Sequence, residues 1–207
     1  MAKSSNNVFF FLLLLLHILV LALCCCFSSA AGASSQYSTD FIRASCAATR
    51  YPSLCVRSLA CYAAAVRRSP RELARFALAV SADRARSAAA RVAGLPAVPP
   101  RSRSGPVRDC LENMADSVDR LRDAAAELAR TGRSGSPAFA WHMSNVRTWC
   151  SAALTDETTC LDGVAQATGG KAKLDPAARA AVRREVLAVA QVTSNALALL
   201  NRVAPQQ

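Results

Sequence analysis

Four short segments of the chain carry the same signal for the start of a helix. They are Ser69–Pro70, Gly105–Pro106, Ser136–Pro137 and Asp175–Pro176. Proline is favoured at the first helical position because an N–H there would have no intrahelical partner, and a preceding Ser or Asp can cap the free amides. Ser69, with Glu72 three residues later, is a candidate capping box. We therefore expect four similar helices joined by short stretches rich in Gly, Pro and Ser.

The apolar residues that follow these starts recur at steps of three and four. The second segment has Val107, Leu111, Met114, Val118, Leu121, Ala125 and Leu128, and the fourth has Val182, Val186, Val189, Thr193, Ala196, Leu200 and Val203. The third segment keeps this spacing except where Glu157 interrupts it. In the first segment, which is rich in Ala, the apolar residues are less confined to one side of the helix. Strand signals are almost absent. Such spacing with short loops predicts an all-α, up-and-down antiparallel four-helix bundle over residues 70–204.

The segment before the bundle, residues 39–68, is predicted to be an N-terminal helical hairpin. Its two short helices are separated at Tyr51–Pro52, because a residue before proline avoids helical geometry. So short a hairpin is not stable alone. Cys46 and Cys55 lie on opposite sides of the turn, and a disulfide between them would stabilise the hairpin by roughly 3 kcal/mol.

Residues 1–31 have the pattern of a secretory signal peptide, with cleavage between residues 30 and 33. Lys3 precedes an apolar run from Val8 to Leu23, and small residues follow. A retained membrane anchor over residues 8–27 is the alternative, since about 20 residues span a bilayer. Cleavage would change the formal net charge from +11 to +10, because Lys3 is the only charged side chain lost.

Six cysteines remain after cleavage, and they are Cys46, Cys55, Cys61, Cys110, Cys150 and Cys160. An even number in an exported domain indicates disulfides, although six cysteines permit fifteen pairings. A metal site is not expected, because His142 is then the only histidine and no CxxC spacing occurs. A lone histidine beside Trp141 predicts a surface or packing role rather than catalysis. We therefore expect neither an enzyme nor a cofactor.

Four stretches of the sequence resemble the plant invertase and pectin methylesterase inhibitor family. They are "SCAATRYPSLC", "DCLENMADSVDRL", "SNVRTWCSAALTDETTCLDG" and "TSNALALL", in the family's order, within residues 37–204. The third is most like the small secreted pectin methylesterase inhibitors. The resemblance implies an inhibitor domain with the bundle and hairpin predicted above, secreted to the apoplast and cell wall, which acts by binding.

The resemblance also implies two disulfides, Cys46–Cys55 and Cys110–Cys160. The second would close about fifty residues and contribute roughly 4 kcal/mol. Cys61 and Cys150 depart from the family pattern. They are predicted either to form a third disulfide between hairpin and bundle or to be two buried thiols.

An acidic stripe on the second helix is the candidate partner-binding surface. Glu112, Asp116, Asp119 and Asp123 recur at steps of four, three and four, opposite the apolar seam. The resemblance implies that acids in this region face the target enzyme, so Asp116 and Asp119 are the first candidates, with Thr159 and Asp162 after them. The alternative is ordinary solvated pairing with Arg108, Arg120 and Arg122.

The resemblance leaves pectin methylesterase as the expected partner and invertase as the alternative target. Invertase inhibitors of this family can insert a Pro-Lys-Phe segment into the enzyme's acidic site, and this chain has Pro137-Ala138-Phe139 without the cation.

The excess of Arg also suits binding of acidic, demethylated pectin, although a merely solvated basic surface would look the same. Nucleic acid is not expected, because the arginines are scattered and do not alternate with aromatic residues. No membrane association is expected after signal cleavage.

Overall fold

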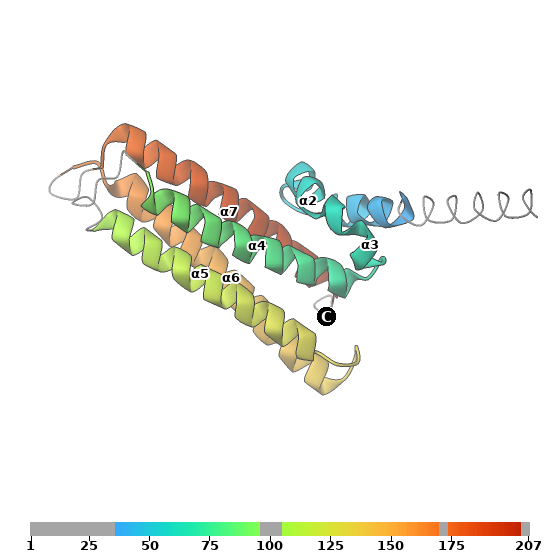
Figure 1. The fold of residues 1–207 in the computed structure, drawn as a ribbon. Helices are drawn as coiled ribbons and strands as arrows, with labels where there is room; N and C mark the ends of the chain where they lie inside the picture. Colours follow the sequence, from blue (N-terminus) through green and yellow to red (C-terminus); the bar gives the residue numbers. More distant parts are fainter. Residues whose placement is uncertain (1–35, 96–104, 170–173, 204–207) are drawn as a thin grey trace, which may run out of the picture.

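The computed structural model describes residues 36–95, 105–169 and 174–203, so the predicted signal peptide lies outside the described residues. The four long helices are α4 (Pro70–Ala93), α5 (Pro106–Arg130), α6 (Pro137–Gln166) and α7 (Pro176–Val203). They form the predicted bundle, in which α5 packs against α6, α4 packs against α7, and α4–α5 and α6–α7 are also neighbours (Figure 1). Each helix begins at the proline that the sequence indicates.

Side-chain caps fix three of these starts. The Ser69 and Ser136 hydroxyls accept hydrogen bonds from the amides three residues later at 3.2 and 3.0 Å. One Asp175 oxygen accepts from the amides of residues 177 and 178 at 2.9 and 3.1 Å. The capping box at Ser69 is only half formed. In a full capping box the Glu72 side chain would accept from the Ser69 N–H. Here the Ser69 N–H donates to the Val66 carbonyl at 2.9 Å, and the Glu72 carboxylate accepts from Arg75 at 2.9 Å.

The N-terminal unit has one more break than the sequence predicts. It comprises a helix over residues 36–46, α2 (Pro52–Leu59), the 3₁₀ turn η1 (Ala60–Tyr62) and α3 (Ala63–Val66). The expected break at Tyr51–Pro52 is present, but η1 then divides the second helix. A 3₁₀ turn has fewer residues per turn and so changes the phase of the side chains. At this point the Tyr62 ring stacks on Phe76 of α4, with centroids 4.6 Å apart.

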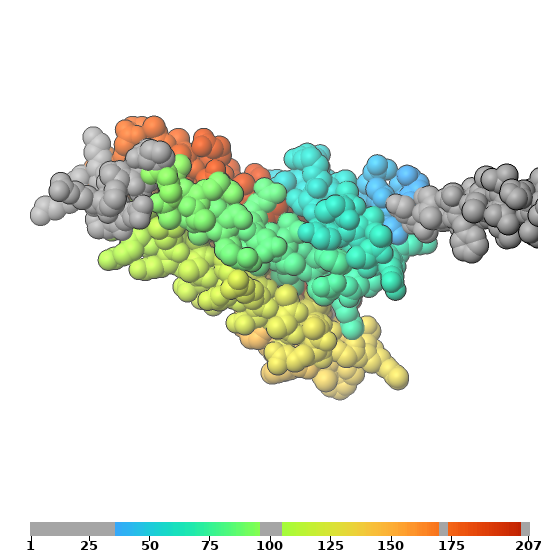
Figure 2. Space-filling view, viewed as in Figure 1, coloured from blue at the N-terminus to red at the C-terminus, as the bar shows by residue number. Residues whose placement is uncertain are grey.

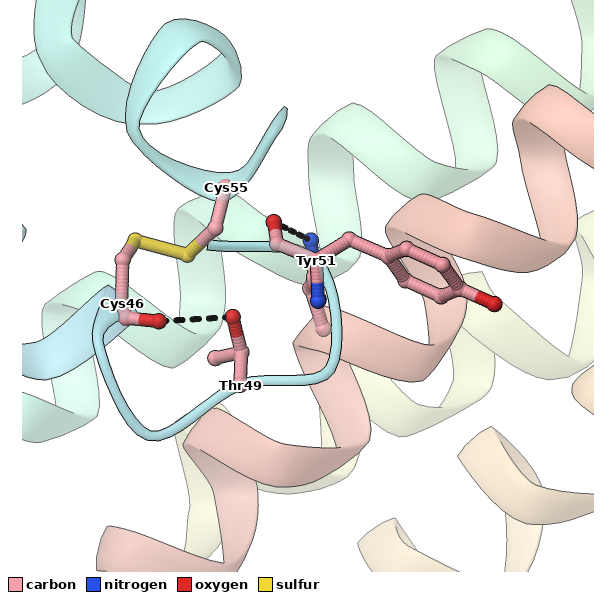
Figure 3. Close-up of a disulfide and its surroundings, with 5 residues drawn as sticks. Cys46, Thr49, Tyr51 and Cys55 are labelled. Atoms are coloured by element: carbon pink, nitrogen blue, oxygen red, sulfur yellow. Dashed lines mark hydrogen bonds between the residues drawn. A yellow bond between two sulfur atoms is a disulfide. The ribbon is translucent and has the colours of Figure 1, made fainter. Parts of the chain in front are cut away.

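Two sets of contacts hold the turn of the N-terminal unit. The structure contains the Cys46–Cys55 disulfide, with Cα atoms 5.6 Å apart, and the Thr49 hydroxyl donates to the Cys46 carbonyl at 2.8 Å (Figure 3). The Asn195 side chain on α7 accepts from the Tyr51 N–H and donates to the Tyr51 carbonyl, both at 3.0 Å. The turn is therefore fastened within itself and to the bundle.

The bundle interior contains two groups of buried side chains. One lies between the N-terminal unit and the bundle and includes Ile42 of that unit with Leu78, Leu121, Met143 and Leu200 of the bundle. The other lies toward the opposite end and includes Met114, Val164, Leu174, Val182 and Val186. The buried face of α4 consists mostly of alanines, which explains why its apolar pattern was weak in the sequence. Alanine adds little side-chain volume and permits close helix packing.

The other four cysteines of the described residues form one disulfide and two free thiols. Cys110–Cys160 links α5 to α6, with Cα atoms 4.3 Å apart. Cys61 and Cys150 are not bridged, so the suggested third disulfide is wrong. Cys61 lies exposed on η1, whereas Cys150 is buried among the helices, where desolvation strongly raises the pKa of its thiol. The expectation of a buried thiol therefore holds for Cys150 alone.

Among the described residues, α7 is long and apolar enough by length and composition to cross a membrane, with a mean hydropathy of 1.3 over its most apolar 18 residues. Its apolar face is instead buried in this bundle, where Val182, Val186, Val189 and Leu200 are 0% exposed. Core packing therefore accounts for its composition.

Figure 2 shows the N-terminal unit (blue to cyan) beside one end of α4 and the α5–α6 connection (yellow to orange) at the same end of the molecule, on the other side of α4 in this view. The Arg71 guanidinium of α4 donates to the Gly132 carbonyl in this connection at 2.7 Å. Because the N-terminal unit lies beside α4, no other described element covers the outer faces of α5 and α6.

Candidate partner-binding face

The acidic stripe of α5 faces outward, as the helical spacing predicts. Glu112, Asp116, Asp119 and Asp123 are all exposed, while the opposite face of the helix, with Val107, Met114 and Leu121, is buried. Four carboxylates repeat along about three turns of one helix face. Like charges at this spacing destabilise a helix slightly unless cations compensate them.

The arginines of α5 compensate only part of this stripe. The Arg108 guanidinium lies 3.6 Å from the Glu112 carboxylate, and the Arg122 guanidinium lies 3.4 Å from the Asp119 carboxylate. Both ion pairs are exposed, and both distances are long for an ion pair. Such pairs contribute little to stability. Within the described part of the chain, neither Asp116 nor Asp123 forms an ion pair. The alternative of simple solvated pairing therefore fits Glu112 and Asp119 better than it fits Asp116.

Arg120 turns away from the stripe and pairs with α6. It meets Asp156 at 2.7 Å, and the Asp156 side chain is only 14% exposed. Desolvation is the main cause that raises the pKa of Asp156, the ion pair with Arg120 opposes it, and the negative charge of Asp116 raises it further. Asp116 therefore lies close to this bridge between the helices, and Arg120 is already engaged by another acid.

The two weaker candidates lie on the outer side of α6. Thr159 and Asp162 are exposed and flank the buried Cys160. The Thr159 hydroxyl donates to the Thr155 carbonyl at 2.8 Å, and the Thr155 hydroxyl donates to the Ser151 carbonyl at 3.1 Å. These hydroxyls are thus used within the helix, and each can still accept a hydrogen bond from a partner.

The four candidates form an elongated face rather than a compact site. The Cys110–Cys160 disulfide fixes the register of the antiparallel helices. With a rise of 1.5 Å per residue, Asp116 and Thr159 lie about 8 Å apart along the bundle axis, and Asp116 and Asp162 about 12 Å apart. We call the exposed surface of α5 and α6 that carries Asp116, Asp119, Asp156, Thr159 and Asp162 the acidic face.

Charge is distributed unevenly between the two halves of the bundle. Helices α5 and α6 together contain nine acidic residues and five arginines, whereas α4 and α7 contain three acidic residues and nine arginines. Residues 36–69 add five arginines and a single acid, Asp40. Glu127 and Glu157 are buried, so the remaining seven acids exceed the five arginines of α5 and α6 by two. This side of a strongly basic protein therefore carries a small excess of negative charge, and a basic partner would be steered toward it.

Comparison with known proteins identifies the family. A family model described as plant invertase/pectin methylesterase inhibitor matches residues 40–199. The chain belongs to this family. It is 47% identical over 176 residues to Pectinesterase inhibitor 9 of Arabidopsis thaliana, covering 82% of this chain and 83% of that protein. It is 42% identical over 178 residues to a 21 kDa protein of Daucus carota, covering 83% and 88%.

A solved structure in the same family has the same fold. The crystal structure of a mutant form of a pectin methylesterase inhibitor from Arabidopsis superimposes with a TM-score of 0.55, covering 75% of this chain and 92% of that chain at 22% identity. The helical bundle of the family thus agrees with the fold described above.

Glu157 is a buried polar residue whose role the sequence did not reveal. It is 0% exposed, and one of its oxygens accepts hydrogen bonds from Ser117 of α5 at 2.7 Å and Thr193 of α7 at 2.8 Å. Its other oxygen has no partner among the described residues. Desolvation raises the pKa of Glu157 to about 7. The sequence did contain a signal for this burial. Glu157 occupies a position where the three–four spacing of α6 would place an apolar residue, and such a position faces the interior of the bundle.

Residues 151–159 of α6, which precede Cys160, are rich in small and hydroxyl-bearing side chains, and they have one buried and one exposed side. Ala153 is fully buried, so the small side chain allows close helix packing there. Ser151, Ala152 and Thr155 instead line a surface hollow of about 550 Å³ between α6 and α7, to which Leu197 and Asn201 also contribute. This hollow adjoins the acidic face along α6, so small residues shape the surface as well as the core.

His142 is part of a packing cluster at the end of the α5–α6 hairpin. Its Nδ1 lies 2.8 Å from the Glu127 carboxylate, to which Asn145 donates at 3.0 Å and Arg130 approaches at 3.0 Å. The Asn145 hydrogen bond, followed by the His142 contact, lowers the pKa of Glu127, which is 3% exposed. The histidine thus braces two helices, in agreement with the packing role predicted for it.

Proposed function

We propose that the mature chain is a secreted inhibitor of pectin methylesterase that binds across the enzyme's substrate cleft. Family membership and a relative named Pectinesterase inhibitor 9 at 47% identity support this target. The observation that carries the proposal is the acidic face, an uncovered pair of helices held in register by Cys110–Cys160 and by Arg120–Asp156. A face held in one geometry loses little entropy on binding.

In this mechanism the carboxylates of Asp116 and Asp119 steer the enzyme and contact its basic groups, while Thr159 and Asp162 extend the contact along α6. With a basic enzyme, charge complementarity would raise the association rate and fix the orientation. No residue of the inhibitor needs to react. The family and the relative named as an inhibitor support binding, rather than catalysis, as the function of this chain.

We propose the same cellular route that the sequence suggests. Residues 1–31 would act as a signal peptide, and residues 37–204 would fold as one inhibitor domain in the apoplast and cell wall. Two disulfides in the described residues support an oxidising compartment, because such bonds persist in secreted proteins. After cleavage the protein would have no membrane anchor.

Invertase is a weaker candidate target. The segment that an invertase inhibitor would insert is Pro137-Ala138-Phe139, which here forms the first turn of α6. Phe139 is 5% exposed, and its amide donates to Ser136. The nearest cation, Arg71, lies 5.6 Å from the centroid of the Phe139 ring and is engaged by the Gly132 carbonyl. A buried aromatic in a capped helical turn, with Ala138 in place of the lysine, is poorly placed to enter an enzyme's acidic site.

Acidic pectin is a second proposed partner, bound through the basic side of the molecule. The arginine excess of α4, α7 and residues 36–69 supports this proposal. Because this side lies away from the acidic face, pectin and enzyme need not compete for one surface.

A paired inhibition assay tests the target. Purified mature protein is added to a plant pectin methylesterase and, in parallel, to an acid invertase. We expect dose-dependent loss of methylesterase activity alone, with affinity falling as pH drops toward about 4, where carboxylates protonate. Loss of invertase activity alone, or of neither activity, would contradict the proposal. An affinity that stays constant from neutral pH to pH 4 would contradict the role of the acidic face.

A further inference from the structure

The basic side of the molecule contains a pocket between the N-terminal unit and α4. Its volume is about 440 Å³, within the range of small-molecule sites. Arg57 and Ser58 of α2 and Tyr62 of η1 form one wall, and a stripe of α4 that includes Arg84 and Arg91 forms the other. Three guanidinium groups therefore line one hollow of the surface.

Two of these arginines are not neutralised by the protein. Arg91 pairs with Glu185 of α7 at 2.6 Å. Asp83, which also lines the pocket, pairs with Arg86 at 2.5 Å. Within residues 36–95, 105–169 and 174–203, Arg57 and Arg84 form no ion pair. The pocket consequently keeps two uncompensated positive charges, and a planar guanidinium binds a carboxylate through two parallel hydrogen bonds.

The rest of the pocket suits a sugar ring. The hydroxyl oxygen of Ser58 is buried and has no hydrogen-bond partner among the described residues. Tyr62 is held in place by its stacking on Phe76, so it offers a rigid aromatic wall. Sugar C–H groups pack against aromatic rings, and sugar hydroxyls satisfy buried polar groups. Cations, hydroxyls and an aromatic wall together match a carboxylated sugar better than a bare anion.

We propose that this pocket binds galacturonate units of de-esterified pectin, with Arg57 and Arg84 holding the carboxylates. The choice of ligand rests on the proposed function, because a methylesterase releases such carboxylates on the polymer where its inhibitor would act. The pocket lies on the basic side, away from the acidic face. The inhibitor would therefore be retained where its target enzyme has already worked, while the acidic face remains free for that enzyme.

Binding is measured by calorimetry with short unesterified oligogalacturonides and with the same oligomers fully methyl-esterified. Measurements are made at about 0.1 M salt, where charges farther apart than about 10 Å are screened. We expect binding of the unesterified oligomers only. The double variant Arg57→Gln/Arg84→Gln should weaken it at least tenfold, since two charge-assisted contacts are lost. The control Arg133→Gln/Arg202→Gln removes two exposed arginines outside the pocket and should change affinity less than about twofold. Thermal unfolding verifies that both variants are folded.

Three outcomes would overturn the proposal. They are absence of binding by the wild-type protein, equal binding of esterified oligomers, and equal weakening in the two double variants, which would mean diffuse attraction to a basic surface. A sulfated oligosaccharide of similar length separates carboxylate recognition from general anion binding, and tighter binding of it would also count against the proposal. Methylesterase inhibition is measured on the same variants. The pocket variant is expected to lose oligomer binding and to inhibit as the wild type does. A wild-type protein that inhibits the methylesterase but binds no oligomer would overturn the pocket proposal alone. A wild-type protein that binds the oligomer but does not inhibit would overturn the proposed function alone.

Discussion

The Glu157 carboxylate of α6 accepts a 2.8 Å hydrogen bond from the Thr193 hydroxyl of α7 in the middle of the bundle. Ser117 of α5 donates to the same oxygen, so one acid connects three of the four helices. Because the carboxyl group is buried, its protonated form is favoured over its ionised form. The bundle core thus contains an acid whose ionised form is disfavoured by burial.

Replacement of Glu157 by Gln should remove part of the pH dependence of stability. The pKa of Glu157 is raised from 4.5 to about 7 in the folded protein, so the folded state binds the proton more tightly than the unfolded state. The contribution of Glu157 to stability is therefore fully present below about pH 4.5 and is lost as pH rises through about 7. This loss is on the order of 3 kcal/mol. Unfolding by urea at pH 5 and pH 8 measures it.

The Gln variant can still accept hydrogen bonds from Ser117 and Thr193 but cannot ionise. We expect its stability to change less between pH 5 and pH 8 than that of the wild type, and to exceed the wild-type value at pH 8. Parallel pH profiles of the two proteins would show that Glu157 does not titrate in this range. Asp119→Gln, which removes an exposed acid, is the control and should leave the wild-type profile intact.

The Asn195 amide is expected to hold the N-terminal unit onto the bundle. Asn195→Ala removes both hydrogen bonds to Tyr51 and leaves a partly buried N–H and carbonyl without partners, which costs about 2–3 kcal/mol. Hydrogen exchange should accelerate first at residues 46–59. Asn201→Ala changes an exposed residue on the same helix and should have little effect. Uniform acceleration throughout the bundle would contradict a local fastening role.

The fold was predictable because its signals are local. Proline after Ser or Asp fixes the helix starts at Pro70, Pro137 and Pro176, and three–four spacing identifies the buried faces of α5 and α7. The buried face of α4 was harder to identify, since alanine contrasts weakly with a polar surface. The extra turn η1 was missed because its cause is tertiary. Its Tyr62 stacks on Phe76, a contact between segments that local propensity does not contain.

The candidate face was only partly predictable. Spacing along one helix places Asp116 and Asp119 on an exposed stripe, but it cannot indicate which arginine neutralises which acid. Arg120 has an acid four residues before it and pairs with Asp156 on another helix instead. Likewise, two unpaired cysteines suggested a bridge, but η1 leaves Cys61 at the surface and Cys150 lies inside the bundle. Both results depend on interhelical geometry.

The two disulfides should differ in the reach of their effects. Cys110→Ala/Cys160→Ala releases a cross-link over a sequence separation of 50 and should lower the free energy of unfolding by about 4 kcal/mol. Cys46→Ala/Cys55→Ala should lower it by about 3 kcal/mol. Only the first pair spans two bundle helices, so only its loss should loosen α5 against α6. Hydrogen exchange measures this, and confinement of both effects to residues 36–66 would refute it.

The acidic face is tested by charge-neutral variants that keep side-chain size. Asp116→Asn/Asp119→Asn should weaken binding to a basic pectin methylesterase about tenfold, mainly through a slower association rate, and should reduce the salt dependence of binding. Of the single variants, Asp116→Asn should have the larger effect, because Arg122 already screens Asp119 while no described cation pairs with Asp116. Asp40→Asn/Asp83→Asn makes the same change in net charge on the basic side and serves as the control. Surface plasmon resonance at two salt concentrations gives the rates, and an equal loss in both double variants would mean that overall charge, rather than this face, guides the encounter.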